Sequence, residues 1–167
     1  KDYSMLSKII NNIDTTNKQT TIDTSTTYQT IEGFGASAAW WAQYVGGWEN
    51  LDEIMELLYS KEKGAGLDIY RYNLGTGSQD DTHITDVDRR TQGFLQKDGT
   101  YDWSRDANAQ KALASAQKAN KDLKVTLFSN SAPVWLTKNG KAYCSNVDNS
   151  NLDSSNYDAF AQFVVKC

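Results

Sequence analysis

The sequence has few cysteines, a single histidine and no surplus of positive charge. Two cysteines, Cys144 and Cys167, are too few for a disulfide framework, although a single disulfide between them is one alternative. The one histidine, His83, lies in a polar segment without a cysteine pair nearby, which argues against histidine-dependent catalytic triads and metal sites. We therefore predict neither a metal nor a cofactor.

Charge and hydropathy exclude two further classes of partner. The 17 Lys and Arg residues are outnumbered by 21 Asp and Glu, giving a net charge of −4, and no basic cluster offers a surface for nucleic acid or anionic membranes. No apolar run approaches the roughly 20 residues of a membrane span. The start at Lys1 instead of Met fits a processed product, so we expect a secreted protein without a membrane span or a nucleic-acid partner.

Aromatic and uncharged polar residues are, by contrast, abundant. Five Trp and nine Tyr accompany many Asn, Thr and Ser residues. Flat apolar rings stack on sugar faces, while amides and hydroxyls bond the sugar rims. The composition therefore favours carbohydrate recognition. Among Trp40, Trp41 and Trp135 we expect only one ring to face a ligand, because most tryptophans of a folded domain pack in its interior.

The residue pattern from Ile31 onward alternates strands and helices. Strands are predicted over 31–37, 67–75 and 124–130, and helices through Trp40 and Trp41, over 50–58, from about 104 to 116 and over 157–166. A long polar segment, 76–102, predicts a structured active-site or surface loop. Three strand–helix units indicate an α/β fold with parallel strands, about the first three units of a (β/α)8 TIM barrel.

One strand carries the clearest functional pattern. Alternation puts Leu67, Ile69, Arg71 and Asn73 on one face, which begins apolar and ends polar. In a barrel this face points inward, and Arg71 emerges at the carboxyl end, where barrel enzymes build their active sites. A guanidinium held there needs a carboxylate. That carboxylate is either a local acid such as Asp68, in a structural ion pair, or one that this chain does not contain.

Three segments in consecutive order resemble blocks of glycoside hydrolase family 30. They are IEGFGAS at 31–37 with Trp40 and Trp41 behind it, RYNLG at 71–75, and SNSAPVWLTKNG at 129–140. Each lies at or directly behind the carboxyl end of a predicted strand, and the resemblance spans about residue 20 to the C-terminus. The tryptophan pair is most similar to the endo-β-1,6-galactanase branch.

The resemblance implies a retaining glycosidase on a (β/α)8 barrel with a small side β-sandwich. Two carboxyl groups about 5 to 5.5 Å apart then serve as acid/base and nucleophile, and the family places both glutamates near the ends of the fourth and seventh strands. Residues 1–30, with apolar residues at helical spacing over 1–13 and threonine-rich edge-strand composition over 20–30, would belong to the sandwich. Residues 31–167 would form the first, incomplete part of the barrel.

The same resemblance implies roles for residues of this chain. The family counterpart of Arg71 lies beneath the reacting sugar and orients a catalytic carboxylate. Asn73 then lies at the pocket rim, and Asn130 and Ser131 end the third strand in an equivalent position, where they either bond substrate or only stabilise a turn.

The glutamates of this chain lie beside the first strand or on and beside the helix at 50–58, so none is expected to be catalytic: Glu32, Glu49, Glu53, Glu56 and Glu62. We therefore expect this chain by itself to be inactive, with an oligosaccharide or polysaccharide substrate and the remainder of its own barrel as partners. The alternatives are a non-catalytic carbohydrate-binding protein and a related family enzyme such as a β-xylanase or glucosylceramidase.

Overall fold

The computed structural model describes residues 23–81, 83–144, 146 and 149–167. The chain divides into two units, 1–32 and 33–167. Residues 23–32 form neither helix nor strand, so the strand expected up to residue 30 is not formed in its described part. An edge strand needs neighbouring strands to pair with. Residues 20–22 and the predicted helix at 1–13 lie outside the described residues, and the β-sandwich stays a prediction.

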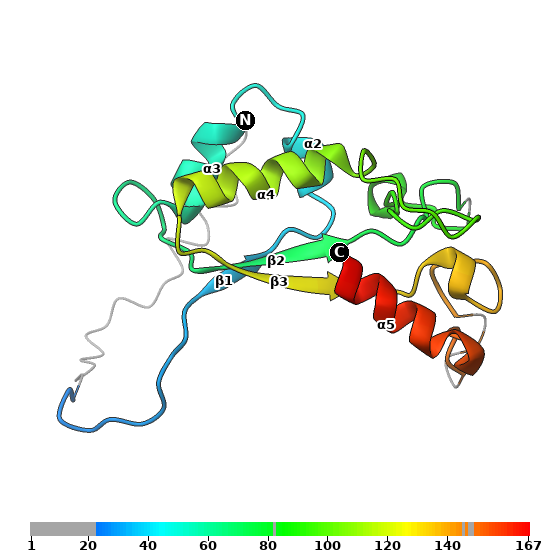
Figure 1. Ribbon diagram of the computed structural model, residues 1–167. Coiled ribbons are helices and arrows are strands. Elements are labelled where there is room, and N and C mark those ends of the chain that lie inside the picture. The colour runs from blue at the N-terminus through cyan, green and yellow to red at the C-terminus, as the bar shows by residue number, and fades with distance from the viewer. Residues whose placement is uncertain (1–22, 82, 145, 147–148) are drawn as a thin grey trace, which may run out of the picture. The chain divides into compact units, whose positions relative to one another are not determined.

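The second unit is built on a parallel sheet of three strands (Figure 1). Strands β1 (Gly35–Ser37), β2 (Ile69–Leu74) and β3 (Lys124–Ser129) follow the order β1-β2-β3. Ser37 is paired with Arg71, and Arg71 with Thr126. All three predicted strands are present, the first only over its last three residues, 35–37. Their parallel order confirms the strand–helix alternation read from the sequence.

Helices cover one face of this sheet (Figure 1). They are α2 (Ala42–Val45), α3 (Leu51–Tyr59) and α4 (Ala107–Ala119), while α5 (Tyr157–Lys166) follows β3. Three 3₁₀ turns, η1 (Val87–Arg89), η2 (Val134–Leu136) and η3 (Ser154–Asn156), lie in the loops. None of the helices in the described ranges is long and apolar enough to cross a membrane.

The hydrophobic core lies between β2 and the helices. Tyr70, Tyr72 and Leu74 alternate with half-exposed residues along β2 and are almost fully buried. Helix α4 meets them with small buried residues, among them Ala112 and Ala116, which allow the helix to pack closely on the sheet. This layer fixes the strand whose opposite face carries Arg71.

Two helix starts differ from the sequence prediction. Trp40 adopts a left-handed backbone conformation with φ 60°, so the helix expected through the tryptophans begins only at Ala42. The helix expected from about 104 also begins later, because residues 102–104 form a tight turn in which Asp102 Oδ1 accepts from the Ser104 amide at 3.0 Å and from the Ser104 hydroxyl. Helix α4 consequently starts at Ala107, directly after the left-handed Asp106.

Helix α5 packs on the loop that follows β2. Its buried Phe163 lies with ring centroid 6.4 Å from Tyr101, and the Lys166 ammonium lies 4.2 Å from the centroid of the same ring. Tyr157 at the start of this helix is 56% exposed, although the helical spacing of Tyr157 and Phe160 predicts that both face inward. Val125 and Leu127 of β3 also remain exposed, since α5 does not cover them.

Candidate functional site

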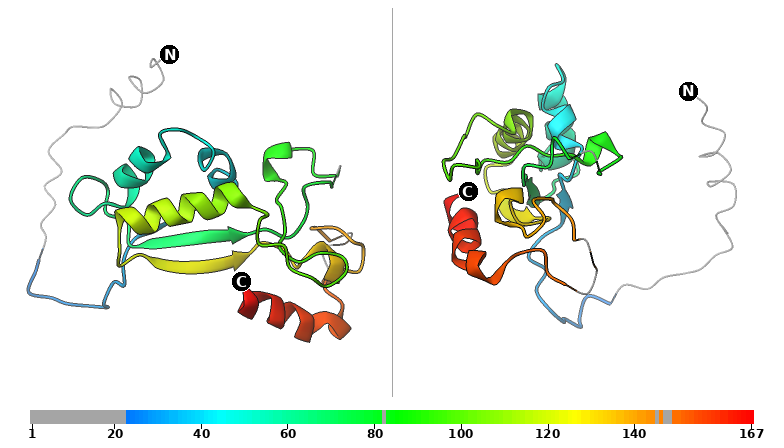
Figure 2. Two further views of the ribbon diagram at one scale, coloured as in Figure 1. Left: turned by 45° about the horizontal axis from the view of Figure 1, so that its top comes forward. Right: turned by 90° about the vertical axis from the view of Figure 1, so that its right-hand side faces the viewer.

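The candidate site lies on the face of β2 opposite the layer of α2, α3 and α4. Arg71 and Asn73 are both half-buried on this face, and they alternate with the core residues Tyr70, Tyr72 and Leu74. The loops after β2 and β3 gather at the same carboxyl end of the sheet (Figure 2). The alternation read from the sequence therefore places the two polar side chains as expected.

Arg71 is held by neighbours on both adjoining strands. Its Nε donates to the Ser37 hydroxyl at 3.1 Å, and its guanidinium carbon lies 4.0 Å from the centroid of the Phe128 ring. No carboxylate pairs with it among the described residues. A guanidinium has five N–H donors, so most of its donors have no acceptor in this part of the chain.

The local ion pair considered for Arg71 is not formed. The Asp68 carboxylate instead pairs with Lys61, with Oδ1 to Nζ at 3.2 Å. Asp68 precedes β2, whereas Arg71 lies in its middle. The donors of Arg71 are therefore available to a group beyond the described residues.

Four of the seven predicted binding residues line one cavity of about 250 Å³ at the carboxyl ends of the strands. They are Trp40, Asn73, Asn130 and Ser131. The Asn130 amide makes no hydrogen bond within the described residues, whereas the Ser131 hydroxyl donates to the Ala132 carbonyl at 2.8 Å. Asn130 is therefore available to a ligand, and Ser131 also serves the turn.

The three candidate tryptophans have different surroundings. Trp40 lines the cavity, with the Arg89 guanidinium carbon 5.2 Å from its ring centroid. The Trp41 indole donates to the Ser37 carbonyl at 2.7 Å, and its ring packs against the core. Trp135 is 46% exposed and donates to the Leu95 carbonyl at 3.1 Å, outside the cavity lining. Trp40 is thus the candidate with access to a ligand in the cavity.

The sequence reading did not single out the residues that the loop after β2 adds to the cavity. Thr76, Ser78 and Thr91 line it and are buried. The Thr91 amide donates to the Ser78 hydroxyl at 3.0 Å, and the two hydroxyls lie 3.3 Å apart. The carbonyl of Gln92 approaches Gly75 so closely that a Cβ there would collide with it. The predicted loop is therefore structured, and it forms one wall of the site.

A buried carboxyl group lies just behind this wall. Asp106 is 7% exposed, and its Oδ2 accepts from the Tyr72 hydroxyl at 2.6 Å. Burial raises the pKa of Asp106 to about 6, and the bond from Tyr72 only partly offsets this effect. The same burial, together with the neighbouring carboxyl, raises the pKa of Tyr72. The polar residue directly before an alanine-rich helix was the only feature that could have marked Asp106 in the sequence.

The single histidine belongs to a contact between two loops. His83 Nδ1 lies 2.7 Å from Lys141 Nζ and 3.3 Å from Asp81 Oδ1. Burial disfavours the Asp81 carboxylate, but the His83 amide and the Lys141 charge outweigh it and lower the pKa of Asp81. No group of three potential metal ligands occurs in the described part of the chain. The acidic loop residues are engaged with neighbouring side chains.

The two cysteines are free thiols, so the bridge left open by the sequence is not formed. Cys144 is exposed in the loop after β3, whereas Cys167 packs against the core beyond α5. Burial raises the pKa of the Cys167 thiol to about 11. These different surroundings explain why the pairing suggested by the number of cysteines does not occur.

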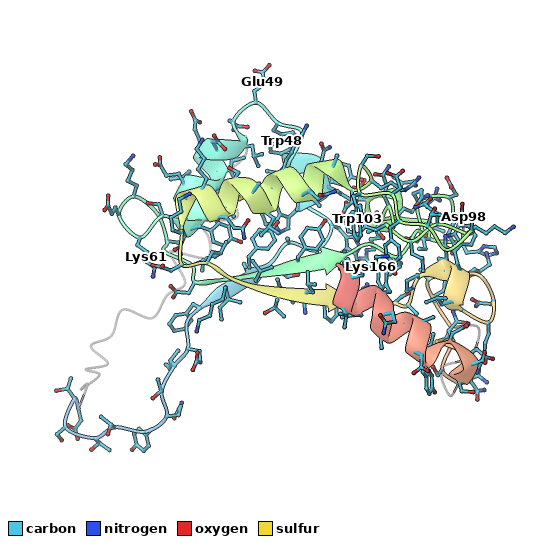
Figure 3. The ribbon with its side chains drawn as sticks, viewed as in Figure 1. Trp48, Glu49, Lys61, Asp98, Trp103 and Lys166 are labelled. Atoms are coloured by element: carbon cyan, nitrogen blue, oxygen red, sulfur yellow. The ribbon has the colours of Figure 1, made fainter. Side chains whose placement is uncertain are left out.

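The glutamates of the helix layer lie far from the strand ends. Glu49 projects from the turn between α2 and α3, away from the sheet (Figure 3). Glu56 pairs with Lys63, with Oε1 to Nζ at 2.9 Å. Neither lines the cavity of Trp40 and Asn73.

A parallel sheet with helices on one face, and with polar residues at its carboxyl ends, defines an α/β protein. The sequence is matched over residues 17–167 by the model of O-glycosyl hydrolase family 30. The chain belongs to this family.

Two relatives are about one-third identical to this chain over the aligned regions. It is 31% identical to an endo-β-1,6-galactanase from Hypocrea rufa, covering 87% of this chain and 34% of that protein. The crystal structure of a conserved exported protein from Bacteroides fragilis is similar with TM-score 0.77 and 33% identity, over 87% of this chain and 32% of the other. The chain thus spans about a third of the length of these relatives.

An endo-β-1,6-glucanase structure is more distant in sequence. It is 16% identical, with TM-score 0.60, over 86% of this chain and 32% of its own. This similarity supports the fold.

Proposed function

We propose that this chain is the amino-terminal part of the catalytic barrel of a secreted, retaining β-glycosidase that cleaves β-1,6-linked galactan. Family membership and the galactanase relative support the reaction class and the linkage. The similar Bacteroides protein is described as exported, which supports secretion. The two glutamates that retention requires are proposed to lie on the remainder of the barrel.

The observation that carries this proposal is the state of Arg71. Its guanidinium is held in place by Ser37 and Phe128 and lacks a carboxylate among the described residues. Arg71 does not itself line the cavity, but it lies on the same face of β2 as Asn73, which does. Such a group orients and stabilises a carboxylate that approaches from elsewhere. Arg71 is then a positioning residue for a catalytic glutamate.

The third strand supports the expectation of further barrel strands. Among the described residues β3 forms one edge of the sheet, and Val125 and Leu127 on this strand are 38% and 39% exposed. Unpaired edges and uncovered apolar faces are unfavourable in water. We propose that a fourth strand pairs with β3 and that further helices cover these two residues.

The test is hydrolysis by the protein encoded by the complete reading frame. We expect release of β-1,6-galacto-oligosaccharides, with the β-anomer appearing first in NMR spectra, and slower or no release from β-1,6-glucan and β-1,4-xylan. The 167-residue chain measured in parallel should be inactive. Turnover by the short chain, or first appearance of the α-anomer, would contradict the proposal.

A non-catalytic carbohydrate-binding protein is the rival function. The cavity residues Trp40 and Asn130 would serve glycan binding equally well without hydrolysis. A reading frame that stops at Cys167 while the chain retains glycan affinity would favour this rival. Continuation into another strand that ends in Asn-Glu-Pro or a similar sequence favours the enzyme.

A further inference from the structure

A second, very small cavity lies between the site and the helix layer. It has a volume of about 10 Å³, room for a single water molecule. Trp40, Asn73 and Thr91 line both this cavity and the larger one at the strand ends. Asp106 lines it from the helix side. The small cavity therefore adjoins the candidate site on one side and the buried carboxyl group on the other.

Asn73 has an unmet hydrogen-bonding requirement here. Its Oδ1 is buried and has no partner among the described residues. Leaving a buried acceptor unpaired is unfavourable, and ordered water commonly satisfies such atoms. Because Asn73 lines the small cavity, a water in that cavity is a candidate donor to this atom.

Backbone strain is concentrated at the same place. Trp40 and Asp106 are the two non-glycine residues of the described chain with positive φ, at 60° and 54°, and both line this cavity. Such conformations persist where the surrounding structure requires them, and they cluster at functional sites. At Asp106 the conformation is held by the backbone amide, which donates to Gln92 Oε1 at 2.7 Å.

We propose that the small cavity holds one ordered water that donates to Asn73 Oδ1 and to the Asp106 carboxylate, which makes Asp106 a positioning residue for Asn73. The Tyr72 hydroxyl already donates to Oδ2 of Asp106, so the carboxylate can accept from the water as well. The water then fixes the amide of Asn73 in the substrate cavity. The catalytic consequence rests on the proposed function, whereas the water itself does not.

Ionisation of Asp106 should strengthen this arrangement. A carboxylate only accepts, so both donors that approach it, Tyr72 and the water, are satisfied. The other titratable or charged groups around Asp106 are Tyr70 on β2, Tyr44 on α2 and Arg90 in the loop after β2. Because the pKa of Asp106 is about 6, the ordering of Asn73 should increase as pH rises through that value.

The first test is a high-resolution crystal structure of the protein from the complete reading frame. We expect one water within hydrogen-bonding distance of both Asn73 Oδ1 and an Asp106 oxygen. In the Asp106→Leu variant this water should be absent and the Asn73 amide less ordered. An empty cavity in the wild type, or a side chain of the completed protein bonded to Asn73 Oδ1, would overturn the inference.

The second test compares pH profiles of kcat/KM between about pH 5 and pH 8. Asp106→Asn keeps the shape and tolerates the left-handed backbone but does not ionise. We expect the ratio of wild-type to variant activity to rise about two- to fivefold through pH 6, the size expected for one hydrogen bond of about 0.5 to 1 kcal/mol. Tyr72→Phe removes the hydrogen bond that lowers the pKa of Asp106. The pH at which kcat/KM changes should therefore be higher in this variant than in the wild type.

Asp102→Asn is the matched control, because this carboxyl caps a turn nearby without lining the small cavity. The ratio of wild-type to Asp102→Asn kcat/KM should stay constant with pH. A constant ratio for Asp106→Asn as well, in an active enzyme, would refute the role of Asp106 and leave the proposed function intact. Absence of hydrolysis by the wild type would refute the function, while the crystallographic water would still test the cavity.

Discussion

The two faces of β2 differ in what they contribute. On one face Tyr70, Tyr72 and Leu74 are buried under α4. On the other face Arg71 and Asn73 stay half-exposed, and Asn73 lines the cavity. Alternation along this six-residue strand thus puts packing side chains and polar side chains on opposite faces, although Leu74 at its end also lines the cavity. Changes on the first face should alter folding, and changes on the second should alter activity.

The largest effect is expected for Arg71→Ala. Removal of the guanidinium should lower kcat/KM for β-1,6-galactan by about a hundred- to a thousandfold, the range seen when one preorganised electrostatic group is lost. Arg71→Lys should recover little, since an ammonium lacks the planar fork. Steady-state kinetics of the full-length protein measure both. Lys61→Ala, which breaks only the pair with Asp68, should keep its activity, and a similar loss there would contradict the assignment.

Leu74→Ala should instead lower the stability of the fold, because it removes a side chain from the core. Leu74 is 1% exposed, and truncation of a buried leucine costs about 3 kcal/mol through lost burial and a cavity. Chemical denaturation measures the change. Leu57→Ala is the matched control, because Leu57 of α3 is 64% exposed and should cost less than about 0.5 kcal/mol. Equal losses at both positions would show that the core has been placed wrongly.

Asp106 links the two faces and should give stability a distinctive pH dependence. Its folded pKa is raised from 3.8 to about 6, so the folded state holds the proton more tightly than the unfolded state. This contribution is fully present below pH 3.8 and is lost as pH rises through 6. Relative to Asp106→Asn, the wild type should lose on the order of 2 to 3 kcal/mol between about pH 4 and pH 7. Denaturation of both proteins across this range measures it, and a flat difference would contradict the raised pKa.

Trp40→Ala should have the smallest of these effects, confined to the open face. Loss of an indole that stacks on one sugar should raise KM by about tenfold, or about 1.4 kcal/mol. Trp135→Ala should leave KM unchanged, since Trp135 lies outside the cavity lining. If Trp135→Ala raised KM and Trp40→Ala did not, the ring that stacks on the sugar would be Trp135 in η2.

Much of this architecture could be predicted from the spacing of apolar residues, which recur every second residue in a strand and about every 3.6 residues in a helix. The strand of Arg71, the helix after Asn50 and the parallel order follow from residue spacing, because burial on one face imposes a strict alternation. The position of Arg71 and Asn73 on a common face could be predicted for the same reason.

Other features depend on contacts between distant segments. The left-handed backbone of Trp40, the delayed start of α4 at Ala107 and the burial of Asp106 arise where the loop after β2 packs on α2 and α4. The separation of Cys144 from Cys167 likewise follows from the packing of α5 against Tyr101. Local propensity carries no information about such contacts.

The order in which the chain is synthesised gives the unpaired edge of β3 a further consequence. If the proposed remainder follows, these strands leave the ribosome before their closing partners exist, with Val125 and Leu127 accessible throughout that interval. The nascent intermediate would therefore be a substrate for chaperones and prone to self-association. Expression yield should then depend on how fast the downstream half follows, as well as on the stability of the finished fold.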